Sequence, residues 1–557
     1  MKHALLLTLL SAGLVLSNGG GNPAAIASPQ AHNPADLVPP VPASTAGYVL
    51  VAWSELGMHC IDGKDYSVFS VLPPYNVIHA QLIQKTEPPT IITTGATVTY
   101  QSTADTKGSV NSSSSSKTNF WNYVNTLFHA NVPPEIGLAG YKTQSATAHN
   151  LTYNTIVGYW EAVGVPTVPY DDKKVFNPYP MAILTAKNSS GTVLATVKIV
   201  LAVSDEMSCK NCHASGSDKA AEPASGWVYN SDPAKDAKLN ILKKHDDRWP
   251  IAKYLTQLEA KGYTYQSSLY QTAISGTPVL CSACHSDNAL SESGITGIRS
   301  LSQDTHNLHG PQVNPATGIT LNKTTDDLNS CYLCHPGPTT LCKRGAMNKR
   351  TCASCHGNVS YVGGSGSRNP WLVEPSCQMC HNTSQRYTTA FASAGVWRQT
   401  TDATFATNAN VPVTGSDLYR YSKGHGGVFC SACHGSPHAE YPTLQANDNV
   451  YPIKLQGYAA KITECATCHS TALTASANGG PHGVHNVGQA WVNAHPDYVD
   501  GRGSQTCAYC HGATFHGSTL SQAKVARTFN TDDGGTKTFP AGHQFSCFDC
   551  HNGPNGG

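Results

Sequence analysis

The stretch that decides the fold runs from residue 331 to residue 356 and reads CYLCHPGPTTLCKRGAMNKRTCASCH. It contains the pattern Cys-x-x-Cys-His twice, once from Cys331 and once from Cys352. Two thiols separated by two residues and followed at once by a histidine form a compact set of attachment points and ligands. The pattern recurs through the second part of the chain, so it organises the fold.

The full chain has 557 residues and carries nine copies of this motif, which use 18 of its 20 cysteines. A pattern this specific does not recur nine times by accident. In chain order the copies are Cys209/Cys212/His213, Cys281/Cys284/His285, Cys331/Cys334/His335, Cys352/Cys355/His356, Cys377/Cys380/His381, Cys430/Cys433/His434, Cys465/Cys468/His469, Cys507/Cys510/His511 and Cys547/Cys550/His551.

The spacing has a chemical explanation. Two such thiols form thioether bonds to the two vinyl groups of one haem, and the adjoining histidine binds the iron as the proximal ligand. We therefore expect nine covalently bound c-type haems. Zinc ribbons, redox-active dithiols and disulfides are the alternatives, but none of them requires a histidine directly after the second cysteine.

Histidine is the expected sixth ligand as well. The chain has 25 histidines but only six methionines, so His/His ligation should dominate. Because methionine raises the potential of a haem, these haems should be low-potential. The candidate distal ligands in the second part of the chain are His245, His306, His309, His425, His438, His482, His485, His495, His516 and His543.

The distal candidates are unevenly distributed. Between residues 310 and 424 every histidine belongs to a motif, so the third, fourth and fifth haems must take distal ligands from farther along the chain. Surplus histidines before and after this interval are sufficient in number. Ligation of this kind would cross-link the fold through iron.

The first part of the chain has four further histidines that this count does not require. We expect His129 and His149 to be surface or hydrogen-bonded residues, whereas His59, in the unusual sequence Gly-Met-His-Cys, is a candidate axial ligand, and His79 is left without a role. The two cysteines outside the motifs are Cys60 and Cys342. In an oxidising compartment a disulfide is their simplest state. A free buried thiol, or an extended attachment of Cys342 with Cys355, is the alternative.

Composition divides the chain into four parts. Residues 1–27 have the charged start, apolar stretch and small-residue cleavage pattern of a signal peptide, with an uncleaved anchor as the alternative. Residues 28–46 form a Pro- and Ala-rich linker, residues 47–204 a β-rich domain without motifs, and residues 205–557 the nine-haem domain. The apolar stretch of the signal is too short to span a bilayer, and no later segment approaches the roughly 18 apolar residues of a membrane helix.

Local patterns predict some elements within these parts. A helix is expected over Pro233–Leu258, begun by Asp232, and the tract Asn111–Ser116 is expected to be a low-complexity loop. Residues rich in Val, Ile and Thr predict strands within Gly47–Trp53, Thr90–Tyr100 and Met181–Val203.

The density of motifs predicts the rest of the fold. About 350 residues must serve nine haems, roughly 40 residues per haem, which is too little protein to bury each haem separately. We expect a multihaem cytochrome c with little regular secondary structure, in which short helices surround an array of adjacent haems. Such an array gives a continuous path for one-electron hopping.

The chain resembles the multihaem c-type cytochromes exported by metal-reducing bacteria. Beyond the nine motifs, the resemblance rests on the segments Leu242–Asp247, Cys331–Cys342, Cys430–Pro442, Pro481–Ala494 and Cys547–Gly557, and more loosely on Leu56–Pro74. It implies low-spin haems, a periplasmic or extracellular location and electron transfer to an external or membrane-bound acceptor. In that family the histidines of such segments commonly serve as distal ligands, which favours His245, His438, His482, His485 and His495.

The expected function is that of an exported electron carrier in anaerobic or extracellular respiration, with other redox proteins or an extracellular acceptor as partners. A reductase of nitrite, hydroxylamine or a sulfur oxyanion with one open-site haem is the enzymatic alternative. A filament protomer or a subunit of an outer-membrane conduit is the structural one. The near balance of 36 basic and 35 acidic residues argues against a nucleic-acid-binding protein. With eighteen haem propionates the mature protein would carry a net charge of about −9 when oxidised and about −18 when reduced.

Overall fold

The computed structural model of the protein describes residues 47–554. The exceptions are 288, 291, 324, 365–390, 394–395, 398–418, 422, 424, 471–484, 486–487, 513, 518–520, 522, 524–525 and 532–533. The predicted signal peptide and linker therefore lie outside the described residues. So do His482 and the fifth motif, at Cys377, Cys380 and His381. By its internal contacts the chain divides into Met1–Leu37 and Val38–Gly557, and only the second unit contains described residues.

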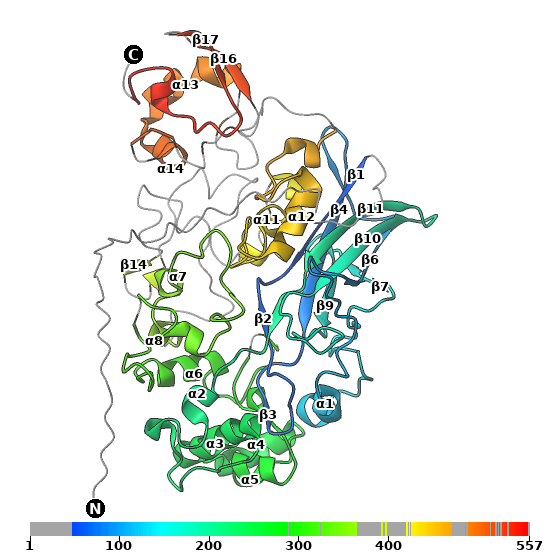
Figure 1. Ribbon diagram of the computed structural model, residues 1–557, viewed down its shortest axis with the longest axis vertical. Helices are drawn as coiled ribbons and strands as arrows, with labels where there is room; N and C mark the ends of the chain where they lie inside the picture. The colour runs from blue at the N-terminus through cyan, green and yellow to red at the C-terminus, as the bar shows by residue number, and fades with distance from the viewer. Residues whose placement is uncertain are drawn as a thin grey trace, which may run out of the picture. The chain divides into compact units, whose positions relative to one another are not determined.

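Two antiparallel sheets form the β-rich region (Figure 1). In spatial order, the first sheet contains β1 (Tyr48–Ser54), β4 (Asn76–Gln84), β9 (Tyr159–Val165) and β8 (Thr152–Asn154), with β5 (Thr90–Ile92) paired to β4. The second contains β11 (Val193–Val200), β10 (Met181–Asn188), β6 (Ala96–Thr103) and β7 (His149–Asn150). The strands predicted from Val, Ile and Thr content are confirmed.

The two sheets enclose one hydrophobic core. In β6, buried Val98 and Tyr100 alternate with more exposed residues, because successive side chains of a strand point to opposite faces. Leu50 and Leu82 from the first sheet and Leu184 from the second are in the same cluster. Burial of this apolar surface holds the sheets together as a β-sandwich.

Strands β1 and β4 are buried on both faces. Their second face contributes Val51, Trp53 and Ile83 to a separate cluster that includes Phe429 of the haem-motif region. Tyr451, from helix α12 (Ala446–Gln456), reaches the sandwich core itself. The near-continuous apolar sequence of β1 is typical of a strand covered on both sides. One face of the first sheet is thus a wall for the haem-motif region.

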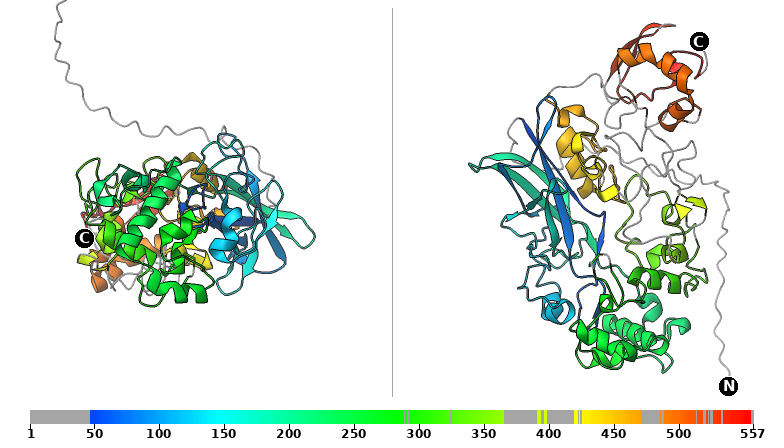
Figure 2. Two further views of the ribbon diagram at one scale, coloured as in Figure 1. Left: turned by 90° about the horizontal axis from the view of Figure 1, so that it is seen from below. Right: turned by 180° about the vertical axis from the view of Figure 1, so that it is seen from behind.

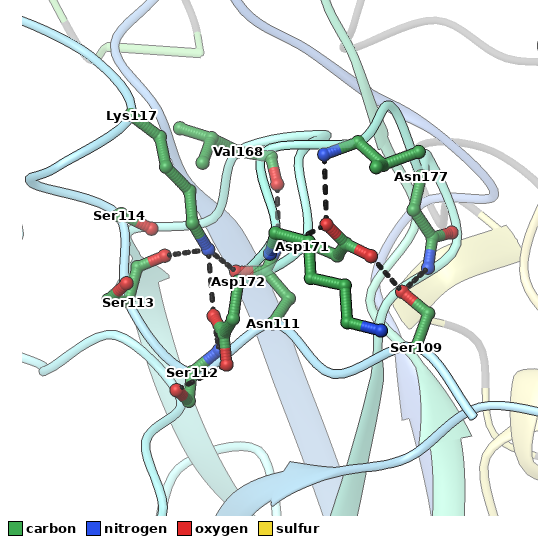
Figure 3. A network of polar contacts seen from close by, with 12 residues as sticks. Ser109, Asn111, Ser112, Ser113, Ser114, Lys117, Val168, Asp171, Asp172 and Asn177 are labelled. Carbon is green, nitrogen blue, oxygen red and sulfur yellow. Dashed lines mark hydrogen bonds and ion pairs between the residues drawn. The ribbon is translucent and has the colours of Figure 1, made fainter.

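The serine tract predicted as a low-complexity loop is held by specific polar contacts (Figure 3). The buried Lys117 ammonium donates to the Asn111 side chain at 2.8 Å and to the Ser113 carbonyl at 2.7 Å, and it pairs with Asp172 at 3.0 Å. Backbone N–H groups of Ser114 and Ser115 also donate to the Glu135 carboxylate. The loop is fixed because a cationic side chain donates to one of its carbonyl groups and an anionic side chain accepts from two of its N–H groups.

A second core lies among helices α1 (Phe120–Phe128), α3 (Pro233–Arg248), α4 (Leu255–Ala260) and α5 (Leu269–Ile274). The last three are drawn in green in Figures 1 and 2. Helix α3 begins as predicted, with Asp232 accepting from the N–H groups of Ala234 and Lys235. It ends at Arg248 and not at Leu258, because Pro250 disfavours helical backbone at Trp249 and cannot continue the hydrogen bonds.

Most of the remaining described elements are short, as the sequence predicted, and the longest of them is a helix of 14 residues. The two-stranded ladders pair β2 (His59–Cys60) with β12 (Val203–Ser204), β3 (Phe69–Ser70) with β13 (Val279–Leu280), β14 (Phe391–Ser393) with β15 (Val396–Trp397), and β16 (Arg527–Thr531) with β17 (Gly535–Phe539). The helices outside the motifs are η2 (Lys219–Ala221), η3 (Ala252–Tyr254), α6 (Leu301–His309), α8 (Val359–Val362), η6 (Tyr419–Tyr421), η7 (His425–Gly427) and α13 (Gln489–Arg502). Among the described helices, none has both the length and the apolar character needed to cross a bilayer.

Candidate haem-binding centre

Each described motif forms a short helical turn. The elements are α2 (Lys210–His213), η4 (Cys281–Ala283), η5 (Cys331–Leu333), α7 (Ala353–His356), α11 (Cys430–His434), η8 (Cys465–Thr467), η10 (Gln505–Cys507) with α14 (Ala508–His511), and η12 (Cys547–Asp549). In several of them the histidine N–H donates to the carbonyl of the first cysteine, as His213 does to Cys209 at 2.9 Å. Positions i, i+3 and i+4 of a helical turn lie on one face. The turn therefore directs both thiols and the imidazole to the same side.

These faces line one connected cavity of about 3740 Å³. Ordinary ligand pockets measure roughly 300–1,000 Å³. The histidines of all eight described motifs line it, together with cysteines of each of those motifs. The wall between them is predominantly apolar, with Phe429, Leu242 and Val279 among its members. A cavity of this size and chemistry suits several flat apolar cofactors in close succession.

Motif histidines face histidines from outside the motifs across this cavity. Within the described residues six such pairs occur, and their ring centroids are 5.9–6.5 Å apart. They are His213 with His309, His285 with His245, His335 with His306, His356 with His438, His511 with His485, and His551 with His495.

This separation fits an iron atom between each pair. An imidazole nitrogen binds a metal at about 2 Å and its ring centroid lies about 1 Å farther out, so two axial imidazoles should have centroids about 6 Å apart. Histidines packed directly against each other would be closer, as the stacked rings of His516 and Phe548 are at 4.1 Å. The residues present therefore fit a six-coordinate haem at each of the six positions.

The ligands are also held in the required protonation state. Burial lowers the pKa of His213 and of His438 to about 4, so both rings are neutral at pH 7. A neutral imidazole can offer a lone pair to a metal. Backbone carbonyls accept hydrogen bonds from Nδ1 of several of these rings, including His285 at 3.0 Å, His511 at 2.9 Å and His495 at 2.7 Å. Such bonds orient the ring and leave Nε2 for the iron.

Neighbouring motifs approach one another closely. The Sγ atoms of Cys331 and Cys352 and a carboxylate oxygen of Asp327 all lie within 4.8 Å of one another. Asp327 also accepts from the Cys352 N–H at 2.8 Å and pairs with Lys343 at 2.7 Å. The first cysteines of the third and fourth motifs therefore lie side by side. We read this cluster as part of the haem array.

Other predicted distal ligands have different neighbours. His543 Nε2 lies 2.7 Å from Asp549, and the exposed His516 stacks on Phe548. His482 lies outside the described residues, and so does the side chain of His425. The sequence predicts that the third haem takes its distal ligand from far along the chain. The histidine that faces its motif histidine is His306, which lies only a short way before the third motif.

The histidines of the β-rich region face no motif histidine in the contacts described. His59 and His79 are buried with no hydrogen-bond partner at either ring nitrogen, and burial lowers the pKa of each to about 3. Nε2 of His149 lies 2.8 Å from the Ser145 hydroxyl, and the exposed His129 packs on Tyr263. Both are therefore surface or hydrogen-bonded residues, as expected. The candidate axial role of His59 stays a prediction.

Cys60 and Cys342 are free thiols in the structure, so the expected disulfide is not formed. Burial raises the pKa of both thiols, and a negative charge on Cys342 would raise the pKa of Cys60 further. Cys342 packs against Met58, Tyr179 and Met181 of the β-rich region. These contacts match the alternative of a free buried thiol.

Sequence reasoning missed one polar residue of the site. The Glu87 carboxylate, in the loop between β4 and β5, accepts from Nδ1 of the motif histidine His469 at 3.0–3.1 Å. The two residues are separated by 382 positions, so no local spacing could have indicated the contact.

Comparison with known proteins agrees with this geometry. The family described as outer membrane cytochrome MtrC/MtrF-like, domains II/IV, matches residues 344–555, which include the last six motifs. This part of the chain is therefore similar to domains II and IV of outer-membrane cytochromes of that family. No curated protein and no solved structure matches the chain.

Proposed function

We propose that this protein is an exported electron carrier with nine covalently bound c-type haems, most of them ligated by two histidines. Each motif would provide two thioether links and the proximal ligand. The observation that carries the proposal is the set of six facing histidine pairs at the separation required by an intervening iron.

In this proposal the distal ligands are His309, His245, His306, His438, His485 and His495, for the first, second, third, fourth, eighth and ninth motifs respectively. His425 and His482 remain the proposed ligands for two of the fifth to seventh haems. Two axial histidines give low-spin, low-potential haems, because neither ligand stabilises the ferrous state as methionine does.

The closeness of neighbouring motifs supports electron transfer from one haem to the next. When bound, each haem supplies a one-electron ferric–ferrous couple. The contact of Cys331 with Cys352 favours adjacent edges for the third and fourth haems. Cys334 lies near Cys209 and Cys212, and burial together with these thiols raises its pKa to about 12. The first, third and fourth haems would thus be successive in one path.

The protein's own residues hold this path in place. The motif turns orient the thiols and imidazoles, and backbone carbonyls fix several rings through Nδ1. Phe429 and Trp53 stack at 5.3 Å between the first sheet and the sixth motif, and such apolar packing excludes water from one side of the array. The proposed partners are other redox proteins and an extracellular acceptor at the outer membrane.

A redox titration of the purified protein, followed by visible spectra and combined with its intact mass, tests the proposal. We expect a mass increase corresponding to nine haems, spectra of low-spin c-type haem and midpoint potentials well below those of His/Met cytochromes. Fewer than nine haems, or a substantial high-spin ferric fraction in the native protein, would contradict it. A high-spin fraction would favour the reductase alternative.

A further inference from the structure

One motif histidine differs from the others in the group that its ring contacts. Nδ1 of His469 lies 3.1 Å from Oε1 and 3.0 Å from Oε2 of Glu87. Since a carboxylate only accepts, the ring must donate this hydrogen bond and leave Nε2 for the metal. In the contacts described for His285, His511 and His551, Nδ1 donates to a backbone carbonyl.

A second motif histidine, His285, also lies near a carboxylate. Its Nδ1 is 3.4 Å from a carboxylate oxygen of Asp304. That ring makes its shorter contact, at 3.0 Å, to the Arg299 carbonyl, and the Arg299 guanidinium lies 3.9 Å from Asp304. Asp304 therefore also pairs with a cation. Glu87 contacts Nδ1 of His469 through both of its carboxylate oxygens.

The position of Glu87 is set by the β-sandwich. It lies in the loop of residues 85–89 between β4 and β5, and these strands pair from Leu82 with Ile92 to Gln84 with Thr90. The seventh motif is also packed on this sheet, because Cys468 contacts the cluster of Val51, Trp53 and Ile83. The first sheet and its β4–β5 loop thus supply an apolar wall, the Glu87 carboxylate and the positive charge of Lys85, which opposes the effect of burial on the pKa of Cys468.

We infer that Glu87 is a positioning residue that lowers the reduction potential of the seventh haem. This inference rests on the proposed function, because it requires a haem at Cys465, Cys468 and His469. A charge-assisted hydrogen bond from Nδ1 to a carboxylate increases the basicity of the imidazole. A more basic ligand, next to a negative charge, stabilises ferric iron relative to ferrous iron.

The β-rich region would then do more than provide a docking surface. Its β4–β5 loop sets the energy of one step in the electron path through a side chain that is itself 44% exposed. His469 is much less exposed, at 12%, so the hydrogen bond joins a sheltered ligand to the protein surface. A partner that moved this loop would change the potential of the seventh haem and leave the ligands of the other haems in place.

The test compares the holoprotein with its Glu87→Gln variant in a redox titration followed by visible and EPR spectra. Glutamine keeps the size of the side chain and an acceptor oxygen but removes the charge. We expect one-ninth of the total haem absorbance change to move to higher potential. The g values of one low-spin EPR component should change with it, because they depend on the ligand field of the axial imidazole.

The matched control is Glu259→Gln, which removes the charge of an exposed carboxylate on α4. Its titration should coincide with that of the wild type. No shift in Glu87→Gln, a shift to lower potential, or an equal shift of all haems in both variants would overturn the inference. Intact mass separates this from failure of the proposed function, because a wild type lacking a haem at the seventh motif would contradict that function directly.

Discussion

Residues 47–204 surround a core of side chains, whereas the haem-motif region from residue 205 onward largely surrounds a cavity lined by thiols and imidazoles. In the first region Leu50, Leu82, Val98 and Leu184 meet in one cluster between two sheets. Burial of such apolar area is the main driving force of folding. In the second region the helices α3 to α5 have a core of this kind, but most motif turns face the cavity of about 3740 Å³.

This difference indicates where each region obtains its stability. The β-sandwich contains the pairings and the core that it needs, so its fold follows from apolar patterning. The haem-motif region instead depends on covalent attachment and iron ligation to complete its interior, as small metal-dependent domains do. The four predictions below test this contrast, first in the haem-motif region, then at the junction, then in the β-rich region, and finally at one ligand.

The largest effect is expected from the double substitution Cys331→Ala with Cys334→Ala. The third motif lies next to the first and fourth, so loss of its haem should unfold much of the surrounding region as well as lower the haem count by one. Intact mass and limited proteolysis measure both effects. The matched control is Cys342→Ala, which removes a nearby thiol outside the motifs and should retain nine haems. Loss of a haem in this control would instead support the extended attachment.

The junction between the two regions should be the next most sensitive place. Arg344 is buried and donates to both carboxylate oxygens of Asp448 at 2.6 and 2.9 Å, and also to the Gly57 carbonyl. Arg344→Met should lower the free energy of unfolding by about 3–5 kcal/mol, because it leaves a buried carboxylate unpaired. Chemical denaturation of the holoprotein measures this.

The double variant Arg344→Met with Asp448→Leu is the control for this pair. It should recover much of the loss, since it removes both charges together. A double variant less stable than the single one would show that the ion pair is not the source of the effect.

A smaller and pH-dependent effect is expected in the β-rich region at Asp172 (Figure 3). Burial alone would raise the pKa of this carboxyl, but hydrogen bonds from Ser112 and Lys117 lower it below its usual value. Because the Asp172 side chain is 37% exposed and solvent screens its charge, Asp172→Asn should cost about 0.5–1 kcal/mol at pH 7, where the hydrogen-bonded ion is replaced by an amide.

The sign of the pH dependence follows from the lowered pKa. The contribution of Asp172 is fully present above the pKa of the unfolded state, about 3.9, and is lost as the pH falls through the lower folded-state value. Thermal unfolding of wild type and variant should therefore converge at low pH. A difference that grew on acidification would contradict this assignment, and the haem count should remain the same throughout.

The two regions also differ in how far their sequences predict them. The strands followed from Val, Ile and Thr content, and the start of α3 followed from Asp232 and Pro233. The predicted end of α3, at Leu258, is wrong because Pro250 ends the helix even though the residues after it favour helical structure. The serine tract was taken as a plain loop because its partners, Lys117 and Glu135, act through the fold.

For the site, the motifs predicted the attachment residues but not which histidines face one another. His306 and His309 lie on the same short helix and face two different motif histidines, His335 and His213. Sequence spacing cannot distinguish these pairings, because they depend on how loops pack around cofactors. The contact of Glu87 with His469 could not be predicted from the sequence either, because it also depends on how distant segments pack.

The most direct test of the central claim is the EPR spectrum of the oxidised His438→Ala holoprotein. His438 faces His356 at 5.9 Å, so in the proposed array its removal should convert the fourth haem from a low-spin to a high-spin ferric form. The matched control is His543→Ala, because His543 contacts Asp549, and its spectrum should stay low-spin. An unchanged low-spin spectrum in His438→Ala, or a high-spin signal in His543→Ala, would contradict the pairing of ligands described above.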